Sequence, residues 1–283
     1  MTPAGRRALA AAEVLFGRHG RWAVLTGAGL SAASGIPTYR DDFGTWQRSR
    51  PIQHQEFIGD ETARRRYWSR SLVGWRHVAR SRPNEAHHAL ARLEAAGRVT
   101  TVITQNVDRL HQAAGHRRVI DLHGRLDRVR CLDCGAFSPR EGLQGRMERD
   151  HPGLGQVDDA ELRPDGDAEP ASDLAAAFRV PACEACAGVL MPDVVFFGGQ
   201  VPRPRVERAR AAVARADGLM VVGSSLMVYS GFRFCREARE LGKPLLIINR
   251  GRTRADDLAT LKVEADCAEA LARLADRIGG PAP

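Results

Sequence analysis

Residues 24–40 read VLTGAGLSAASGIPTYR, and this stretch decides the class of fold that we expect. A short apolar strand runs into Gly27 and Gly29, and small residues then begin a helix. Glycines at such a turn let the backbone approach a pyrophosphate, and the helix N-terminus supplies N–H donors. The stretch therefore predicts a nucleotide-binding turn in an α/β fold.

The residues after this turn argue against an ordinary dehydrogenase. In that class a second strand ends in an acidic residue about 20 positions after the glycines, where it holds the ribose. Here the corresponding window reads FGTWQRSRPIQ and contains neither a strand pattern nor an acid. We therefore expect a different chemistry at the same kind of turn.

Strand and helix patterns alternate along most of the chain. Short apolar runs predict strands at residues 22–26, 99–104, 119–122, 218–222 and 245–249. Apolar residues at helical spacing predict helices at about residues 4–19, 61–80, 84–96, 107–114, 204–215, 230–241 and 266–277. This alternation predicts an α/β fold with a Rossmann-like, doubly wound parallel sheet.

The alternation breaks in two places, which suggests the domain organisation. We assign residues 1–123 and 189–283 to the nucleotide-binding Rossmann-like domain, with a helical insertion at about 41–80. Residues 124–188 form a small inserted module, in which residues 141–173 are rich in Gly, Pro and acidic side chains and predict a solvated acidic loop.

Four of the six cysteines form two C-x2-C pairs, Cys131 with Cys134 and Cys183 with Cys186, separated by 48 residues. Four thiolates can close a tetrahedral zinc site that has no open position, so such a site is structural. Buried cysteines or a redox disulfide are the alternatives. Matched pairs beside the single Cys235 and Cys267 suit a reducing compartment, and we expect a cytoplasmic protein.

The N-terminal residues and the net charge suggest two further interpretations of the chain. The arginine-rich residues 1–21 could form a transit peptide, but their apolar spacing favours an ordinary helix. A net charge of +8 could indicate a zinc-ribbon protein that binds nucleic acid. The arginines are scattered, however, and the loop between the cysteine pairs is acidic, so we do not expect a nucleic-acid partner. We also expect no membrane segment.

Polar residues follow the predicted strands, where open α/β sheets bind ligands. Gln105, Asn106 and Asp108 follow the second strand, although Asn-x-Asp is also a helix-capping pattern. His123 follows the third strand and is a candidate general base, with a structural histidine as the alternative. The later strands are followed by small or polar residues that can bind phosphate or ribose oxygens, namely Gly223, Ser224, Ser225, Asn249, Arg250 and Gly251.

Taken together, these motifs resemble the sirtuin family from about Trp22 to Ile278. The resemblance rests on GAGLSAASGIPTYR, TQNVDRLHQAAG, LHG, the four cysteines, PDVVFFGG, VGSS and NRG. The stretches SRPIQHQEF, RRRYWSRSLVGW, CLDCG and LRPDGD look further like the class II branch, which contains the mitochondrial sirtuin four.

The resemblance implies an activity and its partners. It implies an NAD-dependent protein-lysine deacetylase or deacylase, which transfers the acyl group to ADP-ribose and releases nicotinamide. NAD is then a consumed co-substrate, one structural Zn²⁺ is bound per chain, and the partners are acylated lysine side chains of proteins. A protein mono-ADP-ribosyltransferase that uses the same NAD site is the alternative. We expect a monomer.

The resemblance also implies roles for single residues. His123 is the base that deprotonates a ribose hydroxyl, Asn106 orients the ribose and a water, and Asp108 binds the nicotinamide carboxamide. The other implied contacts with NAD are Gly27, Ala28, Gly29, Ser31, Pro37, Tyr39, Arg40, Trp46, Gln105, Gly223, Ser224, Ser225, Asn249, Arg250, Gly251 and Cys267. The implied zinc ligands are Cys131, Cys134, Cys183 and Cys186, and the substrate strand is Val194, Val195, Phe196, Phe197 and Gly198.

Several positions depart from the family pattern or add to it. Thr38 and Tyr39 stand where the family usually has Asp-Phe, and Gly199 stands where it usually has an acid, which bears on loop closure and substrate preference. Tyr67 and Arg70, three apart on a predicted helix, resemble a Tyr-x-x-Arg pair that recognises acidic acyl chains in a related sirtuin. A surface arginine on an arginine-rich helix is the alternative.

Overall fold

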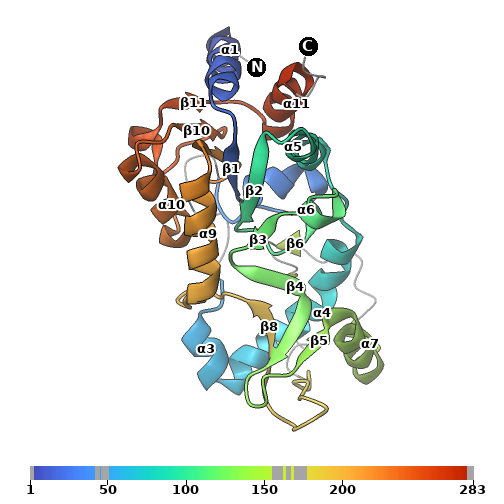
Figure 1. Ribbon diagram of the computed structural model, residues 1–283. Coiled ribbons are helices and arrows are strands. Elements are labelled where there is room, and N and C mark those ends of the chain that lie inside the picture. The colour runs from blue at the N-terminus through green and yellow to red at the C-terminus, as the bar shows by residue number, and fades with distance from the viewer. Residues whose placement is uncertain are drawn as a thin grey trace.

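A sheet of six parallel strands forms the larger part of the molecule (Figure 1). The computed structural model describes residues 3–41, 45, 51–154, 162–163, 167–168 and 177–278. The strands are β3 (Val119–Asp121), β2 (Val99–Thr104), β1 (Trp22–Thr26), β9 (Gly218–Val222), β10 (Leu245–Ile248) and β11 (Leu261–Val263), in that spatial order. This is the doubly wound order, which reverses between β1 and β9. The predicted fold class is confirmed.

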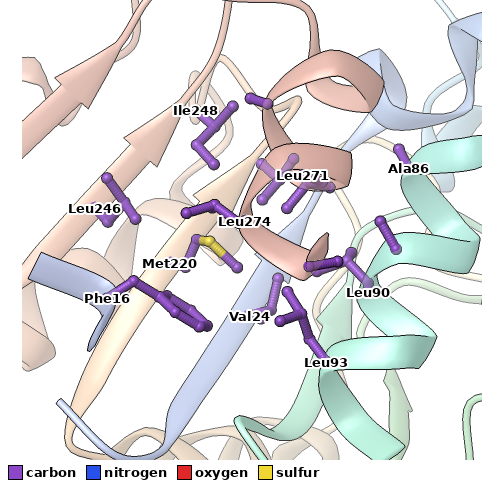
Figure 2. Packing of buried hydrophobic residues seen from close by; sticks show 14 of the residues in the cluster. Phe16, Val24, Ala86, Leu90, Leu93, Met220, Leu246, Ile248, Leu271 and Leu274 are labelled. Atoms are coloured by element: carbon purple, nitrogen blue, oxygen red, sulfur yellow. The ribbon is translucent and has the colours of Figure 1, made fainter. Parts of the chain in front are cut away.

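Helices cover both faces of this sheet. Helices α1 (Pro3–Arg18), α5 (Glu85–Ala95) and α11 (Cys267–Ile278) pack on one face, and α9 (Arg203–Arg215) and α10 (Tyr229–Glu240) pack on the other. Figure 2 shows the first of these layers, where Phe16, Leu90 and Leu274 meet Val24 of β1. Every residue of β1, β9 and β10 is buried, because both faces are covered.

A second, antiparallel sheet lies below the first in Figure 1, and Cys131 is the last residue of one of its strands. Its strands are β5 (Phe137–Pro139), β4 (Gly124–Cys131) and β8 (Leu190–Val194). We call this sheet, residues 140–150 that pack on it and the four cysteines of the two C-x2-C pairs the cysteine module. Strand β8 lies beyond residue 188, where we placed the boundary from sequence, and the division into domains stays a prediction. A hairpin of β6 (Leu162–Arg163) and β7 (Asp167–Ala168) pairs separately.

The insertion after the glycine turn folds as two helices, α3 (His54–Gly59) and α4 (Glu61–Arg80), as far as the structure describes it. Helix α4 has the bounds that we predicted. The prediction of a loop beginning at residue 141 is wrong, because α7 (Arg140–Asp150) is a helix that buries Leu143 and Met147. These two side chains pack with Phe57 and Trp68 of the insertion, so the insertion and the cysteine module share one apolar cluster.

Short elements complete the chain. They are the helices α2 (Ala28–Ser31) and α6 (Leu110–Ala113), and the 3₁₀ turns at Ala32–Ser34 and Asp256–Leu258. Within the described residues, each helix is too short or too polar to traverse a lipid bilayer.

Candidate functional site

The glycine turn after β1 meets the turn after β9 at the point where the strand order reverses. The N–H of Gly29 donates to the carbonyl oxygen of Gly223, 2.9 Å away. A Cβ atom on Gly29 would lie 2.9 Å from the same oxygen, which is too close for any other residue. Open α/β sheets bind ligands in this place, at the carboxyl ends of the strands.

A cavity of about 860 Å³ opens beside these turns. Many of the predicted site residues line it, from both turns, from the ends of β2 and β8, and from α4. They are Gly27, Ala28, Gly29, Tyr39, Arg40, Tyr67, Arg70, Gln105, Asn106, His123, Val194, Val195, Phe196, Phe197, Gly198, Gly223, Ser224, Ser225 and Asn249. Other predicted residues do not line it, namely Ser31, Pro37, Asp108, Arg250, Gly251 and Cys267. Trp46 lies outside the described residues.

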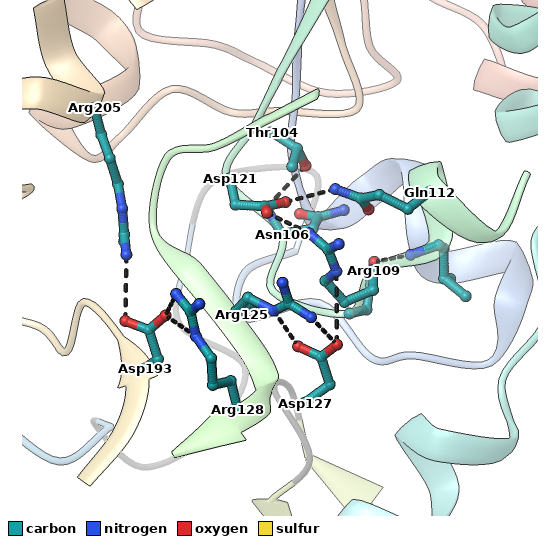
Figure 3. Close-up of polar contacts among 12 residues, drawn as sticks. Thr104, Asn106, Arg109, Gln112, Asp121, Arg125, Asp127, Arg128, Asp193 and Arg205 are labelled. Carbon is teal, nitrogen blue, oxygen red and sulfur yellow. Dashed lines mark hydrogen bonds and ion pairs between the residues drawn. The ribbon is translucent and has the colours of Figure 1, made fainter. Parts of the chain in front are cut away.

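Asn106 ties the end of β2 to the glycine turn. Its Nδ2 donates to the carbonyl oxygen of Gly27 at 3.1 Å and to Oγ of Ser31 at 2.9 Å. Its N–H donates to Oγ1 of Thr104 at 3.1 Å (Figure 3). The hydroxyl of Ser31 donates in turn to Asp108 at 2.7 Å. Ser31 and Asp108 are therefore hydrogen bonded to each other next to the cavity, and burial raises the pKa of Asp108 above its ordinary value.

His123 stands at the cavity with both ring nitrogens partnered. Nδ1 lies 3.1 Å from the carbonyl oxygen of Gln105, and Nε2 lies 2.8 Å from Oγ of Ser230. A carbonyl oxygen can only accept a hydrogen bond, so the partner assigns the proton to Nδ1 and leaves the lone pair on Nε2. Burial lowers the pKa of His123 to about 4, and the positive charge of Arg205 acts in the same direction. The imidazole is thus neutral near pH 7, as a general base must be.

Asp193, near the end of β8, holds three elements together around His123. Its carboxylate accepts from Arg205 of α9 at 3.2 Å and from Nε of Arg128 of β4 at 3.0 Å (Figure 3). The N–H of Val195, two residues further on, donates to the carbonyl oxygen of His123 at 2.7 Å. The position of His123 therefore depends on strands of the cysteine module as well as on the main sheet.

A second polar network lies beside Asn106 in Figure 3. Arg109 has a left-handed backbone, with φ of 69°, and its guanidinium pairs with Asp121 at the end of β3. Gln112 donates to the same carboxylate at 2.9 Å. The loop that carries Asn106 and Asp108 is thereby fixed to the strand that leads into His123.

The predicted substrate segment is only partly a strand. Val194 ends β8, and the residues up to Gly198 continue along the cavity without regular pairing. Phe197 bridges to Gln53, and its ring lies 5.5 Å from that of Tyr39. Tyr67 packs against Phe196, with ring centroids 5.2 Å apart. Both residues of the Tyr67 and Arg70 pair thus face the same cavity as His123.

The C-terminal residues that we predicted near adenosine are mostly tied to one another. Nδ2 of Asn249 donates to the carbonyl oxygen of Gly251 at 3.0 Å, and Arg250 pairs with Asp266 at 2.8 Å. Sγ of Cys267 lies 4.0 Å from the carbonyl oxygen of Ile248, and burial raises the pKa of this thiol to about 12. Cys267 is therefore a protonated packing residue and not a reactive thiol.

Sequence reasoning missed several residues that line the cavity. The start of α10 contributes Tyr229, Ser230 and Arg233, and Arg252 follows β10. Ser230 follows the Gly223–Ser225 turn by only a few residues, but no motif distinguishes it from any other serine. Its importance follows from its contact with His123, which is 107 positions away in the sequence.

The four cysteines of the two C-x2-C pairs come together, as we predicted. Their Sγ atoms all lie within 4.8 Å of one another, with 3.5 Å between Cys131 and Cys186 and 3.9 Å between Cys134 and Cys183. Tetrahedral zinc with Zn–S bonds of about 2.3 Å places its sulfurs about 3.8 Å apart. The geometry fits a Cys₄ zinc site in which all four ligand positions are taken by the protein.

The sequence and the structure both match known proteins. The profile of the Sir2 family matches residues 27–230. "NAD-dependent protein deacetylase 2" of Bradyrhizobium diazoefficiens is 57% identical over 257 residues, which cover 91% of this chain and 94% of that protein. "NAD-dependent protein deacetylase" of Xanthomonas campestris pv. campestris (strain 8004) is 58% identical over 257 residues, covering 91% of this chain and 87% of that protein.

Two solved structures are similar over almost their whole length. One is described as "Structural Basis for the Mechanism and Regulation of Sir2 Enzymes", with a TM-score of 0.77, 29% identity, and coverage of 96% of this chain and 98% of that chain. The other is described as "Sir2-p53 peptide-NAD+", with a TM-score of 0.73, 30% identity, and coverage of 94% and 96%.

Proposed function

The chain belongs to the Sir2 family, and from this premise we propose that it is an NAD-dependent protein-lysine deacetylase. The observation that carries the proposal is the position of His123 at a cavity bounded by the glycine turns, with its Nδ1 facing the carbonyl oxygen of Gln105. Its relatives from Bradyrhizobium and Xanthomonas carry the name of this activity. Acylated lysine side chains of proteins are then its partners.

The geometry supports a separate role for each of three residues of the site. Bound NAD supplies a nicotinamide that can leave and an ADP-ribose that can accept the acyl group. His123 takes a proton from a ribose hydroxyl, because its ring is neutral and Nδ1 is held by Gln105. Asn106 holds the glycine turn in place beside the ribose. Asp108, whose carboxylate accepts a hydrogen bond from Ser31, binds the nicotinamide carboxamide.

The remaining contacts are proposed by position. Gly27, Ala28 and Gly29 approach the phosphates, and a side chain at position 27 or 29 would strike Gly223 or Ser224. The loop of Pro37, Tyr39 and Arg40 closes over the nucleotide, and Trp46, which lies outside the described residues, is a further contact with NAD. The adenosine half lies along Gly223, Ser224, Ser225, Asn249, Arg250, Gly251 and Cys267. The residues Val194–Gly198 receive the substrate peptide, and backbone pairing there permits many sequences.

Cys131, Cys134, Cys183 and Cys186 hold a structural Zn²⁺. All four ligands are thiols of the protein, and the site therefore offers no position for a reactant. The metal instead fixes β4 and β8, which bound the cavity next to His123. This placement makes zinc necessary for the shape of the site and not for its chemistry.

Finer assignments remain proposals. The motifs SRPIQHQEF and RRRYWSRSLVGW support the class II branch. Free cysteines support the cytoplasm, where thiols stay reduced. The large exposed apolar side chains of the described residues are scattered over different elements, which supports a monomer. The scattering of the arginines along the chain supports the absence of a nucleic-acid partner.

The acyl preference depends on Tyr67 and Arg70. Both line the cavity, and Tyr67 is fixed by the rings of Phe57 and Phe196. A guanidinium at a cavity wall can bind a carboxylate through two parallel hydrogen bonds. We propose that this pair favours acyl chains that end in a carboxylate.

One panel of reactions tests the activity and the preference. The protein is incubated with NAD and with acetyl-, succinyl- or glutaryl-lysine peptides, and nicotinamide and O-acyl-ADP-ribose are measured by mass spectrometry. We expect His123→Ala to slow nicotinamide release about 10²- to 10⁴-fold, the usual contribution of a general base. ADP-ribose attached to protein, with no O-acyl-ADP-ribose, would instead identify a transferase.

Two variants on α4 test the acyl preference in the same panel. Arg70→Ala should slow the acidic acyl chains more than the acetyl chain. Arg65→Ala is the matched control, because Arg65 pairs with Glu61 on the same helix and does not line the cavity. Equal losses on all three peptides with Arg70→Ala would show that this arginine has no part in choosing the acyl chain.

A further inference from the structure

The hydroxyl of Ser230 contacts Nε2 of His123, the nitrogen that would act as the base. No sequence motif marks Ser230. It is the second residue of α10, and its Oγ lies 2.8 Å from Nε2. Ser230 and His123 line the same cavity, so the contact forms part of the wall that a bound nucleotide meets. A serine at this place can compete with any hydroxyl that approaches the base.

The direction of this hydrogen bond follows from the other side of the ring. Gln105 presents a carbonyl oxygen to Nδ1 at 3.1 Å, and this oxygen can only accept. Nδ1 therefore carries the proton, and the neutral ring keeps its lone pair on Nε2. Ser230 must then be the donor, with its O–H directed at the nitrogen that would act as the base.

The contact is built into the fold from three elements. A Cβ atom on Gly231 would lie 2.7 Å from Oε1 of Gln105, so only glycine lets the start of α10 come this close. The side chain of Gln105 cannot easily yield, because its Nε2 donates to Oγ of Ser224 at 2.7 Å and to the carbonyl oxygen of Thr26 at 3.2 Å. The backbone carbonyl of Gln105 thus positions the ring of His123, and the side chain of Gln105 packs against the start of α10.

We propose that Ser230 is a positioning residue for His123, whose hydroxyl holds Nε2 in the free protein until a ribose hydroxyl of the bound nucleotide takes its place. This inference rests on the proposed function and extends it. When the ribose hydroxyl donates to Nε2, its O–H bond can break and an N–H bond can form, leaving the negative charge on the ribose oxygen. Ser230 keeps its own proton throughout.

The hydrogen bond from Ser230 to Nε2 affects the pKa of His123. A donor to Nε2 binds only the neutral ring, so it lowers the pKa, and its removal raises the pKa. The charged group that also acts on the ring is Arg205 of α9, which pairs with Asp193 of β8, itself paired with Arg128 of β4. Arg233 of α10 lines the same cavity. None of these groups is changed when Ser230 is replaced.

Nuclear magnetic resonance of the ligand-free, zinc-loaded protein provides a readout that does not depend on activity. We expect Ser230→Ala to raise the pKa of His123 by about 0.5–1 unit, the shift that corresponds to one lost hydrogen bond. Ser230→Thr keeps a hydroxyl and should restore the wild-type value. Ser138→Ala, on exposed β5, is the control for replacing a serine elsewhere and should leave the His123 resonance in place.

Kinetics then distinguish the inference from the proposed function. With Ser230→Ala, the acid limb of kcat/KM for NAD should move to higher pH by the same amount, because it reports the free protein. The acid limb of the kcat profile should stay at the same pH, because the ribose hydroxyl has already replaced Ser230 in the complex. An unchanged His123 pKa and kcat/KM profile with Ser230→Ala would overturn the inference. Absence of nicotinamide release by the wild type would instead reject the deacetylase, with the resonance data still deciding the role of Ser230.

Discussion

The main sheet and the cysteine module are held together by different means. Strands β1, β9 and β10 are buried along their whole length, and helices pack on both faces, one of which Figure 2 shows. In the module, β5 is exposed, and the apolar cluster is completed by side chains of the insertion, such as Phe57 and Trp68. The module also contains four thiols whose Sγ atoms lie within 4.8 Å of one another.

The difference shows where each region gets its stability and why His123 depends on both. The sheet can rely on apolar burial, while a region with a small core usually needs a metal or a disulfide. His123 follows β3 of the sheet, and the next residue, Gly124, begins β4 of the module. The candidate base therefore stands where the two regions join.

The largest effect that we expect follows from removing the zinc ligands. Cys131→Ser, or a strong chelator, should release the metal and unfold the module, since structural zinc contributes on the order of 10 kcal/mol of binding free energy. Activity should fall to background, because β4 and β8 lose their pairing next to His123. Metal content per chain, circular dichroism and hydrogen exchange of the two regions provide the measurements.

A thiol elsewhere provides the control for this experiment. Cys235→Ala removes a buried cysteine of α10 that packs in the main sheet layer, and this variant should keep its zinc. If the chelated protein kept its module protected from exchange and stayed active, the two regions would not differ in the way that we infer.

A cavity created by substitution in the main sheet should have the next largest effect, in this case on the free energy of unfolding. Leu246 is fully buried in β10, and Leu246→Ala should lower the free energy of unfolding by about 2–5 kcal/mol while the zinc content stays unchanged. Leu143→Ala, in the module core, should cost less, because the bound metal still holds the strands. Urea unfolding of the zinc-loaded proteins measures both values. Equal losses would show that the module relies on apolar burial as much as the sheet does.

Sequence could predict the parts that depend on local patterns. Short strands rich in apolar residues and bounded by glycine or polar residues led to β1, β2 and β9 with correct bounds, and two C-x2-C pairs predicted the thiol cluster. Strand β11 was missed because it is only three residues long and contains Lys262. Helix α7 was missed because its apolar residues stand among charged residues and glycines.

What sequence could not predict depends on residues that are distant in the chain. Ser31 and Asp108 come from separate motifs, and no spacing indicated that they bind each other across 77 positions. Ser230 reaches His123 only because Gly231 lets α10 approach Gln105. Such contacts are set by packing between elements, and no spacing within a motif encodes them.

The smallest effect that we expect is a loss of folding stability at acid pH. It arises from the buried histidines of the main sheet region. His87, His111 and His116 lie in a row and meet edge to face, with ring centroids 5.0 and 5.1 Å apart. Burial lowers the pKa of His87 to about 3 and that of His111 well below its usual range. The unfolded chain, whose histidines titrate near 6.5, then binds more protons than the folded chain as pH falls through this value. Stability is therefore lost below about pH 6.5.

The size of this loss can be assigned to single residues. Between pH 7.5 and 5.5 each such histidine should cost about 1 kcal/mol of unfolding free energy. His87→Gln should reduce the pH dependence by about that amount, as measured by urea unfolding at the two pH values. The exposed neighbour offers the matched control, since the side chain of His88 meets water in both states and His88→Gln should leave the dependence unchanged. If His87→Gln and His88→Gln behaved alike, the acid sensitivity would not come from the buried row, and the sheet region would not be the acid-labile half of the molecule.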